Sequence, residues 1–140
     1  MDLKNIYREI VNEHNLHPEH KCEIDYATHT KQGVNPTCGD DITLSIEVDD
    51  NGIITNAGFS GAGCAVSQAS TDIMLDLVVG KSKEEAHQLI EMFMKMVHGE
   101  LSEEEMDDLD EAVALKDIAH MPARAKCATL AWHTLDTMLE

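Results

Sequence analysis

Four cysteines and one aspartate are the residues of this chain whose types and surroundings point to chemistry. Three of the cysteines lie in segments that contain glycine or proline, at positions 35–40, 61–64 and 122–127. The fourth, Cys22, lies in a polar stretch. Because the chain has no Cys-x-x-Cys pair, spacing alone leaves open that these cysteines are small buried hydrophobic residues.

The surroundings of Cys38 favour a ligand or a nucleophile over a core residue. Pro36 and Gly39 predict a turn around Cys38, and Asp40 follows two residues after it. A turn of this kind can direct a thiolate and a carboxylate at one cation. A cysteine that only fills a core needs neither the turn nor the carboxylate.

The other two motif cysteines lie near the expected starts of helices. The positive end of a helix dipole lowers the pKa of a thiol, so we expect Cys64 and Cys127 to favour the thiolate. Arg124 shares a face with Cys127 if the helix has begun by that point, which places a cation beside the sulfur. Three thiolates and one carboxylate suit Zn²⁺, which prefers four tetrahedral ligands. The candidate ligands are Cys38, Asp40, Cys64 and Cys127.

Composition limits the classes of function. The chain has 140 residues with 43% hydrophobic residues, and we expect one domain over residues 1–140. A formal charge of −17 repels phosphate backbones and anionic lipids, so we expect no nucleic-acid or membrane partner. The acidity leaves open both simple solubility and a basic protein partner.

The beginning of the chain lacks the pattern of a secretory signal, and no apolar run is long enough to cross a bilayer. We therefore expect a cytoplasmic protein with reduced cysteines.

Periodicity predicts a mixed α+β fold. Apolar residues at helical spacing predict a first helix over 3–14, and residues 15–37 are expected to form a long polar loop. Alternation over 42–48 predicts a strand, and the turn residues at 50–52 predict a return strand over 53–59. The segment 60–63 is expected to break that strand before Cys64. The sheet is thus predicted as an antiparallel hairpin.

Helical spacing dominates the rest of the chain. A helix is expected over 67–79, and the Ser82–Glu85 pair predicts a capping box for the next one, which ends at Gly99. The acidic stretch 100–111 predicts a weaker helix with a solvated face. A last helix is expected to start between 122 and 127. The whole predicts a small antiparallel sheet combined with helices.

The three cysteine segments together resemble those of the IscU/SufU/NifU-N family. The resemblance rests on Asn-Pro-Thr-Cys-Gly-Asp, Gly-Ala-Gly-Cys-Ala and Pro-Ala-Arg-Ala-Lys-Cys-Ala-Thr-Leu-Ala-Trp, which occur in the family's order and cover nearly the whole chain. It implies an α+β fold in which helices pack on one face of a small antiparallel sheet. It also implies a role in iron–sulfur cluster assembly, with partners from that machinery.

Two branches of the family differ beside the third cysteine. IscU-type scaffolds typically carry His there, whereas SufU-type proteins carry Lys and an insertion before it. Lys126 and the acidic stretch after Gly99 are similar to the SufU pattern. This resemblance implies a zinc-dependent sulfurtransferase that accepts persulfide sulfur from a SufS-type cysteine desulfurase. The alternative is a scaffold on which a [2Fe–2S] cluster is assembled, and a purely structural zinc module is a third interpretation.

Within this interpretation we expect Cys38 to receive the persulfide, because a mobile turn lets its side chain leave the metal at least cost. Arg124 is expected to support the site by steadying charge near Cys127. The rival acceptor is Cys127, as in the IscU branch.

Residues 15–33 depart from the family's usual pattern, which leaves the docking of the N-terminal segment open. The histidines around Cys22 raise a second metal site as a hypothesis, but their spacing does not support it, and a variable polar loop is the simpler interpretation.

Overall fold

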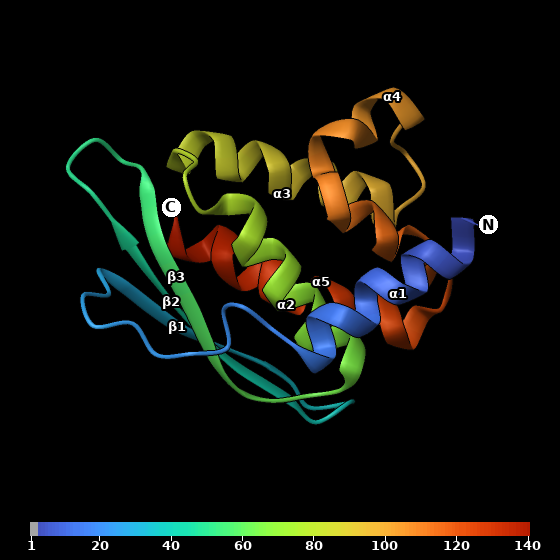
Figure 1. Ribbon diagram of the computed structural model, residues 1–140, viewed down its shortest axis with the longest axis horizontal. Coiled ribbons are helices and arrows are strands. Elements are labelled where there is room, and N and C mark those ends of the chain that lie inside the picture. The colour runs from blue at the N-terminus through green and yellow to red at the C-terminus, as the bar shows by residue number, and fades with distance from the viewer. Residues whose placement is uncertain (1–2) are drawn as a thin grey trace.

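The computed structural model describes residues 3–140, with helices packed against one face of an antiparallel sheet (Figure 1). The expected α+β class is confirmed. The elements in chain order are α1 Leu3–Leu16, β1 His29–Asn35, β2 Asp40–Val48, β3 Ile54–Ala62, α2 Ala65–Val78, α3 Lys83–Val97, α4 Glu103–Met106, the 3₁₀ helix η1 Asp107–His120 and α5 Pro122–Met138.

The sheet has the order β1-β2-β3, and both strand pairs are antiparallel. Along β2 the side chains alternate between a buried face with Ile42, Leu44 and Ile46 and a more exposed face. This pattern is the one predicted for a strand with one buried side. The turn after β2 is closed by Asp49, whose Oδ1 accepts the amides of Asn51 and Ile53 at 2.9 and 3.0 Å.

Strand β1 corrects the prediction that residues 15–37 form a loop without regular structure. Its sequence, His-Thr-Lys-Gln-Gly-Val-Asn, buries only Gly33 and Asn35 and leaves Val34 exposed. A strand at the edge of a sheet does not need alternating apolar side chains if a small residue lets a helix pack directly against its backbone. At Gly33 the hydroxyl oxygen of Thr134 on α5 occupies the space where a Cβ would lie, and Leu130 packs beside it. No hydrophobic period therefore signals this strand in the sequence.

Helices α2 and α5 lie next to the sheet, and side-chain hydrogen bonds connect the two helices. The hydroxyl of Ser70 donates to the carbonyl of Ala128 at 2.6 Å, and it accepts the indole N–H of Trp132 at 2.9 Å. The Trp132 ring stacks on Phe93 of α3, with ring centroids 3.8 Å apart. The predicted capping box begins α3, because Ser82 and Glu85 exchange hydrogen bonds.

Helix α1 is attached to α2 by a buried polar contact. Nδ1 of His14 lies 2.7 Å from Oδ2 of Asp72, whose side chain is fully buried. The other oxygen of Asp72 accepts the backbone amide of His20 at 2.8 Å, so the same carboxylate also fixes the chain after the helix. The docking of this segment, which the sequence left open, thus depends on Asp72.

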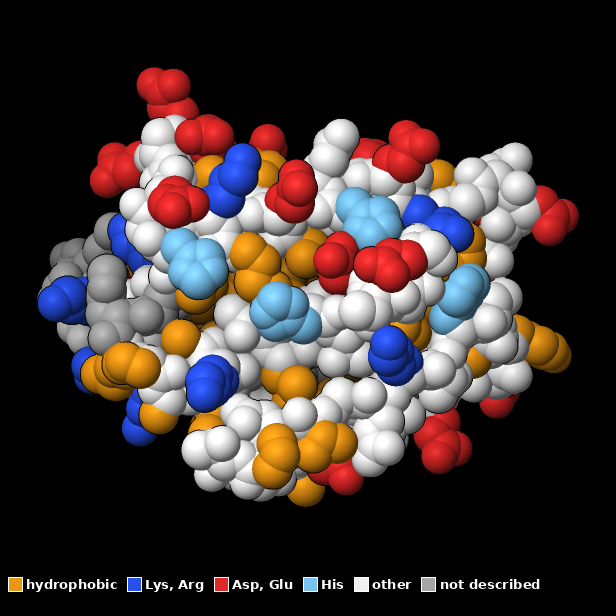
Figure 2. Space-filling view, turned by 180° about the vertical axis from the view of Figure 1, so that it is seen from behind, with side chains coloured by type: hydrophobic (Ala, Val, Ile, Leu, Met, Phe, Trp, Pro, Cys, Tyr) orange, Lys and Arg blue, Asp and Glu red, His pale blue; other side chains and the backbone are white. Residues whose placement is uncertain are grey.

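The acidic segment forms a short helix followed by a 3₁₀ helix. Ser102 and Glu105 make the expected capping box of α4. The weak α-helix predicted over 100–111 is otherwise wrong, because η1 takes over from Asp107 and buries Ala112 and Leu115 at a spacing of three residues, the 3₁₀ repeat. Figure 2 shows carboxylates gathered over this α4 region of the surface. Within residues 3–140, no helix is both long and apolar enough to cross a membrane.

Candidate functional site

Three of the four predicted ligands meet at one end of the sheet. A carboxylate oxygen of Asp40 and the sulfur atoms of Cys38 and Cys127 all lie within 4.8 Å of one another. They come from the turn after β1, the first residue of β2 and the second turn of α5. Segments that are almost ninety residues apart in sequence therefore supply ligand atoms to one point.

Cys38 lies at the tip of the hairpin formed by β1 and β2. Asn35 pairs with Asp40 at the end of the two strands, and the amide of Cys38 donates to the carbonyl of Asn35 at 3.2 Å. Gly39 completes the turn with φ +74°, a conformation that favours glycine. The Cys38 side chain is exposed, and its sulfur lies 3.9 Å from the carbonyl oxygen of Ala123. The strand that the sequence did not reveal is therefore the element that positions Cys38.

Asp40 is fully buried and has one free acceptor. Its Oδ1 accepts the backbone amide of Cys64 at 2.9 Å, whereas Oδ2 has no hydrogen-bond partner among the described residues. Position 63 beside this carboxylate requires glycine, because the Cβ of any other residue would lie only 2.8 Å from Oδ1 of Asp40. A buried carboxylate oxygen without a donor is costly unless a cation or a proton satisfies it. The arrangement fits a metal ion held by Asp40 and the neighbouring sulfur atoms.

Cys64 adjoins this group as the N-cap of α2. Its sulfur accepts the amide of Ser67 at 3.4 Å, and its side chain is exposed. It lies outside the set of atoms that are all within 4.8 Å of one another, although its side chain interacts with that of Cys127. The hydroxyl oxygen of Ser67 is buried without a partner in the described residues. Cys64 is thus held beside the group by the start of a helix, as the sequence predicted.

Cys127 lies deeper than expected. It is only 4% exposed, and its sulfur lies 3.5 Å from the carbonyl oxygen of Ala123, one helical turn before it. Burial raises the pKa of the Cys127 thiol above its ordinary value, and the neighbouring side chains of Cys38, Asp40 and Cys64 raise it further. The expectation that the helix terminus lowers this pKa is wrong, because Cys127 is the sixth residue of α5 and lies beyond the reach of the terminal dipole.

The raised pKa has a chemical consequence for the group. Four acidic groups face one another, and the protein's own surroundings favour the protonated form of the Cys127 thiol. A bound divalent cation reverses this preference, because it stabilises the thiolate and releases the proton. Zn²⁺ or iron suits the donor set of sulfur atoms and one carboxylate.

The side chain of Asn35 also approaches Cys127. Its amide nitrogen lies 4.0 Å from the sulfur, so it can donate a weak hydrogen bond to a thiolate. Asn35 belongs to the first cysteine motif, but its place in the sequence predicts no such contact, since only the β1–β2 pairing brings it to α5. Arg124 is exposed, and among the described residues its side chain forms no hydrogen bond or ion pair. Its supporting role stays a prediction.

Cys22 does not join the group. Its side chain is exposed, and its carbonyl oxygen packs against the Cα of Gly58 in the middle of β3. Another set of possible metal ligands, Glu19, His20 and Asp76, lies elsewhere. Sequence spacing could not reveal that set, because Asp76 is contributed by α2 from more than fifty residues away.

Known proteins resemble the chain over nearly its full length. The model of the NifU-like N terminal domain matches residues 6–136. The iron–sulfur cluster assembly scaffold protein IscU of Streptococcus pyogenes serotype M1 is 41% identical over 133 residues, which cover 95% of this chain and 82% of that protein. The zinc-dependent sulfurtransferase SufU of Bacillus subtilis is 34% identical over 135 residues, which cover 96% and 90%.

The fold is shared with a solved structure as well. FiSufU from Fervidobacterium islandicum AW-1 superimposes with a TM-score of 0.89 at 31% identity, and the match covers 99% of this chain and 100% of that one. A match over complete chains includes the sheet and the helices packed on it. The chain therefore belongs to the NifU-like N-terminal domain family, the IscU and SufU group of iron–sulfur cluster assembly proteins.

Proposed function

We propose that this chain is a scaffold on which a [2Fe–2S] cluster is assembled, with Cys38, Asp40, Cys64 and Cys127 as the ligands. The observation that carries the proposal is the convergence of two cysteine sulfur atoms and a buried, half-satisfied carboxylate, with a third cysteine adjoining. Cysteine thiolates are the usual ligands of such clusters. The scaffold name of the relative at 41% identity supports this function.

Exposure suits a scaffold that must load and release its cargo. Cys38 and Cys64 are exposed, whereas Cys127 and Asp40 are buried beneath them. Iron and sulfide can thus reach the group from one side while the buried pair holds its position. A cluster bound in this way remains open to a partner protein, and the iron–sulfur assembly machinery supplies that partner.

A second function uses the same residues, namely zinc-dependent sulfur transfer from a SufS-type cysteine desulfurase. Two features that resemble the SufU pattern favour it: Lys126 stands before the third cysteine, and the acidic α4–η1 segment lies between the second and third cysteines. The SufU relative at 34% identity supports it as well. When bound, Zn²⁺ supplies a charge that keeps the thiols deprotonated.

The transfer step in this second function is a thiol–disulfide type exchange. The Cys38 thiolate attacks the outer sulfur of a persulfide on the desulfurase, and a new S–S bond forms as the old one breaks. The desulfurase cysteine leaves as a thiolate, while the transferred sulfur keeps its proton. Cys38 is accessible for this attack, whereas Cys127 is almost fully buried. No oxidant or reductant is consumed.

One pair of measurements separates the two functions. Under anaerobic conditions the protein is incubated with Fe²⁺, L-cysteine and a catalytic amount of desulfurase, and visible absorption is recorded. A scaffold develops the bands of a [2Fe–2S] cluster in proportion to protein, and the Cys22→Ser control does so equally. A sulfur-transfer protein instead stays colourless, retains zinc and increases the rate of the desulfurase in a zinc-dependent manner. If neither the cluster nor the rate increase is observed, both functions are wrong.

A further inference from the structure

A second group of metal-ligating side chains lies at the opposite end of α2 from the cysteines. One ligand atom each from Glu19, His20 and Asp76 all lie within 4.8 Å of one another. At a rise of 1.5 Å per residue, Asp76 is about 18 Å along the helix from Cys64. The group therefore shares no ligand with the cysteine centre and is a separate candidate site.

The backbone of His20 is fixed from three sides. Its amide donates to Oδ1 of the buried Asp72 at 2.8 Å, and its carbonyl accepts the amides of Phe59 and Cys22, each at 2.9 Å. The His20 side chain is 17% exposed, and its Nε2 lies 3.3 Å from Oδ1 of Asp76. A ligand held in place before binding loses little conformational freedom when the ion arrives.

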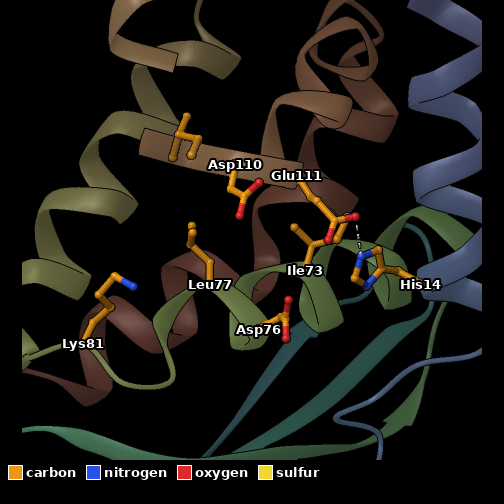
Figure 3. A pocket seen from close by; sticks show the side chains of 8 residues that line it. His14, Ile73, Asp76, Leu77, Lys81, Asp110 and Glu111 are labelled. Carbon is orange, nitrogen blue, oxygen red and sulfur yellow. Dashed lines mark hydrogen bonds and ion pairs between the residues drawn. The ribbon is translucent and has the colours of Figure 1, made fainter. Parts of the chain in front are cut away.

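Asp76 lies one helical turn after Asp72, so the same face of α2 holds the backbone of His20 and meets its side chain. Figure 3 shows Asp76 at the border of a cavity that also contains His14 and Glu111. The carboxylates of Asp76, Asp110 and Glu111 line this cavity together with Lys81 and with His14, whose raised pKa favours its charged form. The excess of negative charge favours cations next to the group.

The neighbouring lysine does not neutralise the group. Lys21 follows His20 in sequence, but its ammonium donates a hydrogen bond of 2.6 Å to the side chain of Gln68. Gln68 lies two turns of α2 before Asp76, so the charge of Lys21 is directed towards the cysteine end of the helix. The carboxylates of Glu19 and Asp76 and the imidazole of His20 therefore face a common point without a lysine between them.

We propose that Glu19, His20 and Asp76 bind one first-row divalent cation at a second site. One imidazole nitrogen and two carboxylate oxygens suit ions such as Mn²⁺, Fe²⁺ and Zn²⁺, and three ligands leave positions for water. Binding joins the segment after α1 to α2 and adds to the hydrogen bond from His20 to Asp72. The site is weaker than the cysteine centre, since it is partly exposed and contains no thiolate.

Mn²⁺ is the probe that separates the two sites, because it prefers oxygen and nitrogen ligands to thiolates. The ¹⁵N-labelled protein is first loaded with one equivalent of Zn²⁺, which fills the stronger cysteine centre, and is then titrated with Mn²⁺ while amide signals are followed by NMR. We expect saturable broadening centred on residues 19–20 and 76. The readout gives position, so it stays valid whether or not the cysteine centre holds zinc or assembles clusters.

Matched variants complete the experiment. His20→Asn and Asp76→Asn should each weaken Mn²⁺ binding at least tenfold, whereas His17→Asn, which changes an exposed histidine of the same segment, should leave it unchanged. The Asp76 variant keeps the proposal testable if His20→Asn disturbs the fold. Broadening that centres on the α4 carboxylates, or that persists unchanged in both variants, would overturn the proposal.

Discussion

The backbone amide of Cys64 donates a hydrogen bond of 2.9 Å to Oδ1 of Asp40. Through this bond the first residue of β2 holds the residue that caps α2, and two of the cysteine segments are fixed relative to each other. Asp40 therefore has a structural function through one oxygen, while its other oxygen remains free for a metal.

Asp40→Ala should loosen the metal without abolishing binding, because three thiolates remain and water can take the fourth position. It should also lower the free energy of unfolding by about 1–3 kcal/mol, since the Cys64 amide loses its acceptor. Asp40→Asn keeps an oxygen for that amide and should lose less stability. Zinc transfer to a chelator and thermal unfolding of both variants test this. An Ala variant isolated without metal under mild conditions would show that the carboxylate is indispensable.

Persulfide should accumulate on Cys38. This cysteine is exposed at the tip of a hairpin, whereas Cys127 is 4% exposed and sits inside α5. Incubation with desulfurase and L-cysteine, followed by mass spectrometry of peptides, locates the added sulfur. The Cys38→Ser variant should lose most of the modification, and Cys22→Ser should retain it. A modified Cys127 peptide beside an unmodified Cys38 peptide would assign the acceptor role to Cys127.

His14 should make stability depend on pH. Burial of His14 acts to lower its pKa, but hydrogen bonds to Asp72 and Glu111 outweigh this and raise it above 6.5. The charged form thus stabilises the fold fully below pH 6.5, and this contribution is lost as pH rises through the raised pKa. Denaturant unfolding of the wild type and His14→Asn from pH 5 to 9 measures the difference.

The difference in unfolding free energy between wild type and His14→Asn should therefore shrink towards high pH. The exposed His17→Asn variant serves as the control and should follow the wild type throughout. A difference that stays constant or grows with pH would contradict a charged His14 between the two carboxylates.

Asp110→Gly should stabilise the protein. Asp110 has φ +50° at the kink in η1, a conformation that costs a non-glycine residue about 1 kcal/mol or more. Relief of this strain should exceed the extra entropy that glycine gains in the unfolded chain. Asp108→Gly changes an exposed aspartate without positive φ in the same helix and should destabilise. Chemical denaturation of both variants tests this prediction. A free energy of unfolding for Asp110→Gly below that of the wild type would refute the assignment of strain.

The parts of the site that the sequence revealed are those with local signals. The turn around Cys38 and the proline at the start of α5 are recognisable because each residue type restricts its own backbone. Likewise, alternation along β2 predicts which side chains are buried. Such signals need no knowledge of distant segments. The break expected over 60–63 is wrong, because β3 continues to Ala62.

The parts that the sequence did not reveal depend on contacts between distant segments. Strand β1 is stabilised where Gly33 meets Thr134, a contact that leaves no hydrophobic pattern. The raised pKa of Cys127 depends on how deeply α5 is buried and on the three acidic groups that face it. The contact between His20 and Asp76 joins residues that are 56 positions apart. Residue types alone predict none of these, because the geometry arises only when the helices pack on the sheet.

X-ray absorption at the zinc edge of the zinc-loaded protein tests the ligand set most directly. With Cys38, Asp40, Cys64 and Cys127 as ligands, the first shell should contain three sulfur atoms at about 2.3 Å and one oxygen at about 2.0 Å. The Cys22→Ser variant should give the same spectrum, and Asp40→Ala should keep all three sulfur atoms. A shell of four sulfur atoms, or one with a single sulfur, would contradict the account.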